Sequence, residues 1–371
     1  MKKRKILKTV LVSLLSLVVL CGAVLGGLVI NNRVKLNKAK ERLDARGLYN
    51  PVSVGDHNLN VVVAGNTNGE HKIVTLTGWS DGTESVSWDI FTDQVRKDNE
   101  MIYIDRAGYG LSDDVDVDVY TAERTVDEYR TALKNAGIEA PYVLLAHSIG
   151  GVYTTYWVEH YPEEIEGVFI MDGSYPSDVS ELLDSIDAES IIRMQYLYNN
   201  SGLARYTDSQ YAEFYDKLPR EDGELARELM IKTSSSKNAK KELIAFANDS
   251  LANEAFGNIK GTDIPKVYLC SSSAYETKEE LAEDNFDMDI HDFIPDSQLK
   301  AIMERTGLTE DDYYDLVLEY FKDERNDYIV PYVESLGNSK VVYLHGEHEI
   351  FVDKPQETQE LLLDFLEELG E

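Results

Sequence analysis

The sequence predicts an α/β protein in which a mostly parallel sheet of eight strands carries a helical cap insertion and follows one N-terminal transmembrane helix. Three observations support this prediction. Short apolar runs alternate with helical patterns, one long interval between two of these runs is helical, and an uncharged apolar segment stands near the N-terminus. The sheet and its helices should extend from about Val52 to Glu371.

The N-terminal segment has the pattern of a membrane anchor. "MKKRK" precedes Thr9–Ile30, which carries no charged residue and is long enough for a helix that crosses about 30 Å of hydrocarbon. Basic residues favour the cytoplasmic side, so we expect a single-pass protein of the cell membrane whose folded domain is extracytoplasmic. A cleaved signal peptide and a lipid-modified Cys21 are the alternatives.

The chain should divide into three parts. Residues 1–33 form the basic cytoplasmic stub and the transmembrane anchor, residues 34–50 form a polar, helix-permissive stalk, and residues 51–371 form the folded domain. Hydrophobic residues make up 43% of the chain, which indicates a globular domain with a sizeable core.

Seven short apolar runs predict strands of the sheet. Each run is rich in branched and aromatic side chains, as strands buried on both faces are. Helical patterns lie between most of the runs, which favours a parallel sheet with helical crossovers. The runs are "LNVVVAG" (59–65), "KIVTLTG" (72–78), "MIYID" (101–105), "YVLLAHS" (142–148), "GVFIMDG" (167–173), "PKVYLCSSS" (265–273) and "KVVYLHG" (340–346).

Two helical stretches interrupt this alternation. The interval between Gly173 and Pro265 contains no convincing buried strand, and it predicts a cap at about 176–262. A second helical insertion, rich in Asp and Glu, occupies 276–336.

The charge of the chain limits its partners. The formal net charge is −32, although residues 1–40 contain basic residues and no acidic ones. The folded domain is therefore strongly acidic and should repel nucleic acid and anionic lipid. We expect no nucleic-acid partner, and the N-terminal helix should provide the contact with the membrane.

The stretch "VLLAHSIGGVY" (143–153) places a serine between a buried strand and a helix. In a sharp strand-to-helix turn the Oγ of Ser148 is exposed, and the amide of Ile149 lies at a helix N-terminus, where an anion is favoured. The usual pattern is Gly-x-Ser-x-Gly, and here Ala146 takes the first glycine position. The alternative role of Ser148 is that of a helix cap.

Two further segments carry the resemblance to a known family. "LTGW" (76–79) ends a strand with a glycine followed by Trp79, and "DRAGYGLSD" (105–113) follows the next strand. With the serine turn, these segments resemble the α/β-hydrolase superfamily, whose members often carry Asp-Arg-x-Gly-x-Gly-x-Ser at this point. The resemblance implies an α/β-hydrolase fold in which the amides of Trp79 and Ile149 form the oxyanion hole.

A nucleophilic serine needs a base, which is most often histidine. In the family the base follows the last strand, ahead of a proline that opens the last helix. "LHGEHEIFVDKP" (344–355) matches this arrangement and favours His348, with His345 as the alternative. His147 neighbours the serine on the strand and should point to the other face as a packing residue.

The carboxylate that orients the base has two candidates. Most family members place it after the next-to-last strand, where this chain has "YLCSSSAYETKEE" and Glu276 is the nearest acidic residue. Asp172, in "FIMDGSYP", ends the preceding strand, a position that some hydrolases of this fold use. We favour Asp172 over Glu276; the competing role of Asp172 is that of a turn residue.

These residues predict a membrane-anchored serine hydrolase that cleaves a small carboxylic ester or small amide through an acyl-enzyme. Ser148 would attack, His348 would carry the proton, Asp172 would orient His348, and no metal or organic cofactor is implied. A small-molecule substrate is the expected partner. A proline-type aminopeptidase on the same core, and a surface interaction or sensor protein that has lost the chemistry, are the alternatives.

The cap sequence suggests the kind of substrate. Tyrosines and aliphatic residues in "MQYLYNNSGLARY" and "SQYAEFYDKL" stand at spacings that could face a pocket or form simple core. A pocket lined by them would suit a short, neutral acyl group.

Overall fold

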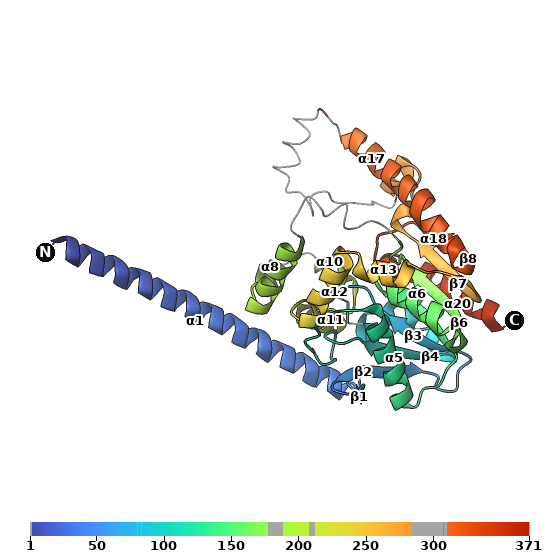
Figure 1. Cartoon of the computed structure of the whole chain (residues 1–371), viewed down its shortest axis with the longest axis horizontal. Helices are drawn as coiled ribbons and strands as arrows, with labels where there is room; N and C mark the ends of the chain where they lie inside the picture. Colours follow the sequence, from blue (N-terminus) through green and yellow to red (C-terminus); the bar gives the residue numbers. More distant parts are fainter. Residues whose placement is uncertain are drawn as a thin grey trace.

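The fold is built on one eight-stranded sheet (Figure 1). The computed structural model of the chain describes residues 2–79, 81–82, 84–176, 188–207, 212–283, 307 and 310–370. The strand order is β1-β2-β4-β3-β5-β6-β7-β8. The strands are β1 Pro51–Ser53, β2 Asn58–Gly65, β3 Lys72–Leu76, β4 Glu100–Asp105, β5 Tyr142–His147, β6 Ile165–Met171, β7 Thr262–Cys270 and β8 Gly337–Tyr343.

Most neighbouring strands are parallel. The pairs β1–β2 and β2–β4 are antiparallel, and every other pair in the sheet is parallel. The predicted eight-stranded, mostly parallel sheet is therefore confirmed. Its carboxyl edge gathers the ends of β3, β5, β6 and β8, where ligands bind in open α/β sheets.

The central strands are apolar on both faces because helices cover both sides of the sheet. On β5, Leu144 and Ala146 belong to one hydrophobic cluster, whereas Val143 and Leu145 belong to the cluster on the opposite face. This alternation follows from the two-residue period of a strand. The continuous apolar runs of the sequence therefore predict strand positions well.

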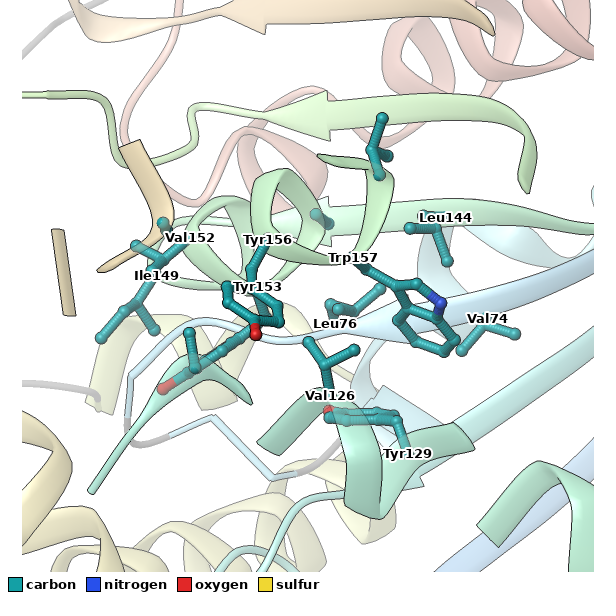
Figure 2. Packing of buried hydrophobic residues seen from close by; sticks show 14 of the residues in the cluster. Val74, Leu76, Val126, Tyr129, Leu144, Ile149, Val152, Tyr153, Tyr156 and Trp157 are labelled. Atoms are coloured by element: carbon teal, nitrogen blue, oxygen red, sulfur yellow. The ribbon is translucent and has the colours of Figure 1, made fainter. Parts of the chain in front are cut away.

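Helices α5 (Ala122–Ala136) and α6 (Gly150–His160) cover one face of the sheet. Figure 2 shows Tyr153 and Trp157 of α6 in the same packed cluster as Val126 and Tyr129 of α5. Val74, Leu76 and Leu144 are the side chains of the strands in this cluster. The other face is covered by α3 (Asp89–Thr92), α4 (Val95–Asp98), α19 (Ile350–Asp353) and α20 (Pro355–Gly370). Helix α2 (Glu84–Ser87) buries Val86, and the short η1 (Pro162–Glu164) precedes β6 without a buried residue.

Two helical insertions extend from the sheet. Between β6 and β7 lie α8 Ala188–Ser201, α9 Ala204–Thr207, α10 Ala212–Lys217, α11 Arg220–Ser234, α12 Lys237–Ala247 and α13 Ser250–Phe256. Between β7 and β8 lie η2 Ser272–Ala274, α14 Lys278–Glu283, α17 Glu310–Asp323, the π-helix η3 Glu324–Ile329 and α18 Val330–Ser335. Parts of the predicted insertions, 177–187, 208–211, 284–306 and 308–309, lie outside the described residues.

The N-terminal segment is one long helix, α1 (Lys2–Ala45), which extends away from the sheet (Figure 1). Its part from Leu15 onward is long and apolar enough to cross a membrane, as an anchor or a signal sequence would be. The helix contains the residues that we predicted as a stalk as far as Ala45. Its last turns pack on the cap, where Leu43 joins a cluster with Leu225 and Leu229 of α11.

We expect the docking of α1 on the cap to stabilise the folded domain. Leu43 is 1% exposed, so Leu43→Ala should lower the free energy of unfolding by about 2–5 kcal/mol. Val34 is 46% exposed, and Val34→Ala should change it by less than about 0.5 kcal/mol. Urea unfolding of the detergent-solubilised chain measures both. Equal effects of the two substitutions would contradict docking of the helix end.

Candidate active site

Ser148 stands on the sharp turn between β5 and α6. Its φ is +53°, in the left-handed region that side chains other than glycine rarely adopt. The turn leaves no space for a side chain at Gly150, because a Cβ there would lie 2.0 Å from the carbonyl oxygen of Leu76. The amide of Gly151 donates to the carbonyl of Ser148 at 2.9 Å, which starts the helix directly after the serine. The strained turn and the Gly150 contact are the local geometry expected for an exposed nucleophile.

The loop after β3 presses against this turn. A Cβ at Gly78 would lie 2.8 Å from Nδ1 of His147 and 3.3 Å from Cβ of Ser148, so glycine permits the close approach. Trp79 follows in the chain, and its side-chain Nε1 donates to the carbonyl of Ala239 in α12 at 3.3 Å. Gly78 and Trp79 line the same cavity as Ser148, and the oxyanion-hole role of the Trp79 and Ile149 amides stays a prediction.

Arg106 fixes the position of the loop after β3 through hydrogen bonds to its backbone. Its guanidinium donates to the carbonyl oxygens of Thr77 and Gly78, each at 3.0 Å. It also forms an ion pair with Glu242 of α12, whose Oε1 lies 2.8 Å from Nε. Both side chains are buried, and although burial opposes the charge of Arg106, Glu242 raises the pKa of Arg106 above its usual range. Arg106 thus connects the loop beside Ser148 to the cap.

Glu242 is the centre of a wider buried network. Besides Arg106, it accepts hydrogen bonds from the hydroxyl groups of Tyr109, Tyr120 and Tyr153. Its carboxylate is fully buried, so these donors supply the solvation that water would otherwise give. The sequence analysis missed Glu242, and the only signal was the arginine of "DRAGYG", whose partner lies 136 residues away.

His348 and Asp172 meet across the carboxyl edge of the sheet. Nδ1 of His348 lies 2.7 Å from Oδ2 of Asp172. Asp172 follows β6 with φ +42°, and its other oxygen accepts from the amide of Ser271 at 3.0 Å. The two predicted residues therefore form one hydrogen-bonded pair, on loops adjacent to the turn that carries Ser148.

The contact between His348 and Asp172 shifts the pKa of both side chains. Burial alone would lower the pKa of His348, but the hydrogen bond and the charge of Asp172 outweigh it and raise this pKa to about 9. Burial would raise the pKa of Asp172, but the bonds from His348 and Ser271 lower it below its usual value. The His348 side chain is 45% exposed, so water screens part of its attraction to Asp172.

His147 packs on the face of the sheet that carries Val143 and Leu145, with its ring 5.0 Å from that of Phe351, as expected of a packing residue, but it also lines the cavity with Ser148, which was not expected. Its Nε2–H donates to the backbone carbonyl of His348 at 2.9 Å, and the two ring centroids are 4.7 Å apart. Burial and the neighbouring His348 lower the pKa of His147 to about 3. A neutral His147 therefore supports the loop that presents His348.

The alternative residues lie elsewhere. The carboxylate of Glu276, 67% exposed, forms an ion pair with Arg325 at 3.2 Å. The ring of His345 stacks on Tyr275 with centroids 4.6 Å apart. Within the described part of the chain, neither Glu276 nor His345 forms a hydrogen bond or ion pair with His348 or Asp172.

A cavity of about 180 Å³ opens over these residues. Its wall includes Ser148 and His348 together with two carboxylates, and the cap contributes Met230 of α11. The lining residues are Gly78, Trp79, Asp81, His147, Ser148, Met230, His348 and Glu349. The site is therefore small and carries negative charge close to the serine.

The cap tyrosines that we considered for the pocket do not line it in the described residues. Tyr196 packs under the ammonium group of Lys240 at 4.3 Å, and Tyr215 contacts the sulfur of Met230 at 2.6 Å. Tyr206 is 59% exposed. Tyr211 lies outside the described residues. Tyr215 thus reaches the cavity only through Met230.

A comparison with known protein families agrees with the observed fold. A family model described as alpha/beta hydrolase fold matches residues 73–254. The uncharacterized protein YbdG of Bacillus subtilis (strain 168) is 31% identical over 210 residues, which are 55% of this chain and 61% of that protein. The uncharacterized protein YqjL of the same organism is 31% identical over 91 residues, 24% of this chain and 36% of that protein. The chain thus spans less than two thirds of these relatives.

Solved structures resemble the chain over most of its length. A mutant of an epoxide hydrolase from Bacillus megaterium has a TM-score of 0.56 at 17% identity, with 86% of this chain and 100% of that chain covered. The enol-lactonase from Burkholderia xenovorans has a TM-score of 0.54 at 14% identity, with 85% and 99% covered. A thermophilic esterase from Thermogutta terrifontis has a TM-score of 0.53 at 11% identity, with 86% and 98% covered. At these identities the likeness establishes the fold.

The His348–Asp172 pair predicts an unusually basic histidine. In a ¹³C-histidine NMR titration of the solubilised chain, His348 should titrate well above 6.5, near 9, and Asp172→Asn should lower its pKa. Because folding raises the pKa of His348, its contribution to stability is present at pH 6.5 and is lost as the pH rises through about 9, whereas the contribution of Asp172, whose pKa folding lowers, is lost in acid. His147 should stay neutral down to about pH 3. Titration of His348 at 6.5 or below in the unsubstituted chain would contradict the pairing.

Proposed function

Because the chain belongs to the α/β-hydrolase superfamily, we propose that it is a serine hydrolase that cleaves a small carboxylic ester, or a small amide, through an acyl-enzyme. The observation that carries the proposal is the 2.7 Å hydrogen bond between His348 and Asp172 beside the turn of Ser148. A serine on a strained turn, a base and an orienting carboxylate are the parts that nucleophilic acyl transfer needs.

The proposed reaction has two halves. Ser148 Oγ attacks the carbonyl carbon while Nε2 of His348 takes its proton, and the amides of Trp79 and Ile149 stabilise the oxyanion. The tetrahedral intermediate collapses, and His348 returns the proton to the departing alcohol or amine, which leaves an acyl group on Ser148. Water, deprotonated by His348, then attacks this ester, and Ser148 is released with its proton restored.

The position of Asp172 favours a serine hydrolase over an interaction or sensor protein that has lost the chemistry. The lack of an aspartate after β7 was the reason to consider an interaction or sensor protein. Asp172, at the end of β6, accepts the Nδ1–H of His348 instead, and the amide of Ser271 holds its second oxygen. In the neutral form of His348, which its raised pKa makes the major form only above about pH 9, this arrangement fixes the tautomer in which Nε2 is free to accept a proton.

The cavity supports a small, uncharged substrate. Its volume of about 180 Å³ is below the 300–1,000 Å³ or so of drug-sized ligand pockets. Asp81 and Glu349 line it and would repel an anionic group. The same two carboxylates favour a cationic amine, which keeps the aminopeptidase as a second candidate.

Covalent labelling tests the proposal. A fluorophosphonate probe should modify the purified chain, and Ser148→Ala should abolish the modification. Ser174→Ala is the matched control, because Ser174 lies beside the same turn, its amide donating to the carbonyl of Ser148 at 2.9 Å, and it should leave labelling intact. An unlabelled parent chain, or labelling that survives Ser148→Ala, would refute the proposal.

The two histidines after β8 should differ in their effect on turnover. His348→Ala removes the base and should reduce hydrolysis of p-nitrophenyl acetate about a thousandfold or more. His345→Ala should have a much smaller effect, since His345 stacks on Tyr275. The reverse ranking in steady-state assays would assign the base to His345.

Substrate size and charge should govern the rate. In a p-nitrophenyl ester series from acetate to palmitate, activity should peak at short acyl chains, because the cavity is small. A negatively charged ester should be hydrolysed more slowly at low ionic strength, and added salt should reduce the difference. Peak activity on palmitate, or a preference for the anion, would contradict this account. Cleavage of proline-β-naphthylamide ahead of every ester would favour the aminopeptidase.

A further inference from the structure

Helix α8 of the cap carries an apolar stripe that the rest of the described chain leaves open. Ile191, Met194 and Leu197 are 49%, 65% and 66% exposed. Their spacing of three places them along one side of the helix. Three neighbouring apolar side chains on one exposed surface mark an interaction site more often than scattered ones do.

The opposite side of α8 is fixed to the cap. The side-chain amides of Asn199 and Asn200 donate to the carbonyls of Ser234 and Ser235 at 3.0 and 2.9 Å. The ammonium nitrogen of Lys240 lies over the ring of Tyr196, 4.3 Å from the ring centroid. The helix therefore cannot turn its apolar stripe inward without breaking these contacts.

The end of α8 meets α1 where the uncharged part of α1 ends. A Cβ at Gly202, directly after α8, would lie 3.0 Å from the carbonyl oxygen of Leu28. The amide of Asn31 donates to the hydroxyl of Tyr206 at 2.7 Å. In Figure 1, α8 leaves α1 to one side near the middle of that helix, rather than following it toward the sheet. The stripe thus lies at the level where α1 would leave a membrane.

A buried ion pair between α9 and α11 holds α1 just after the end of α8. The guanidinium of Arg205 donates to Oδ1 of Asn32 at 2.8 Å and to Oε2 of Glu228 at 2.6 Å. Arg205 is only 6% exposed, so breaking the contact would leave a buried charge without its partner. Because α9 begins directly after α8, at Ala204, this contact fixes the end of α8 beside α1.

We propose that the stripe formed by Ile191, Met194 and Leu197 is seated in the surface of the lipid bilayer that α1 spans. The cap then has two membrane contacts, the transmembrane helix and an interfacial helix beside it. Insertion of apolar side chains would provide the attraction, because a chain of formal net charge −32 is repelled by anionic headgroups. This inference rests on α1 as the membrane span and is independent of the proposed hydrolase activity.

Depth-dependent fluorescence quenching tests the seating. The full-length chain is reconstituted in phosphatidylcholine vesicles with and without brominated acyl chains, and tryptophan is introduced by Met194→Trp. Val19→Trp in α1 is the positive control, and Leu316→Trp is the matched control, since Leu316 is an exposed leucine on α17 whose exposed fraction of 49% equals that of Ile191 in the stripe. The native Trp79, Trp88 and Trp157 give the background in the unsubstituted chain. Leu197→Trp repeats the test at a second stripe position.

We expect bromine to quench the tryptophans at 194, 197 and 19, and to leave the one at 316 unchanged. Quenching at 19 alone would overturn the proposal. Emission at long wavelength would then mean that the stripe faces water, and blue-shifted emission would mean that protein, such as a second copy of the chain, covers it. Absence of quenching at 19 would remove the membrane span and the proposal with it, whereas hydrolysis of p-nitrophenyl acetate would be unaffected.

Discussion

The buried ion pair between Arg106 and Glu242 links the core to the cap. Arg106 follows β4 and binds the carbonyls of Thr77 and Gly78, whereas Glu242 belongs to α12 of the cap. Removing one partner of such a pair costs about 3–5 kcal/mol, because the other charge stays buried. The loop that approaches Ser148 and the cap that closes the cavity must therefore keep their positions together.

The parts that sequence could predict are those set by local pattern. The apolar runs identify the strands because both faces of the sheet are covered, and the glycine after Ser148 follows from the contact with the Leu76 carbonyl. His348 could be selected because a single loop joins β8 to the last helices. For the carboxylate that orients His348, the sequence favours Asp172 over Glu276 without excluding either. The hydrogen bond that distinguishes Asp172 joins residues that are 176 positions apart in the sequence. Local pattern proposes such a pair, but only the sheet order brings its members together.

Other features depend on packing that no short segment encodes. Glu242 is one of many acidic residues of the cap, and only its burial among Arg106 and three tyrosines distinguishes it. His147 has the alternation of a strand residue, yet it lies at the strand's end, where the chain turns and its ring reaches His348. The polar segment after the anchor gives no sign of docking, because Leu43 finds its partners in α11, far along the chain.

The central claim is that Ser148 receives the acyl group. Its most direct test is rapid quenching of the chain with p-nitrophenyl butyrate, followed by mass analysis of the peptide that contains residues 143–153. The account predicts a butyryl adduct on Ser148 that forms with the first release of nitrophenolate and disappears as substrate is consumed. Release of nitrophenolate without an adduct on Ser148, or with the adduct on another residue, would contradict it.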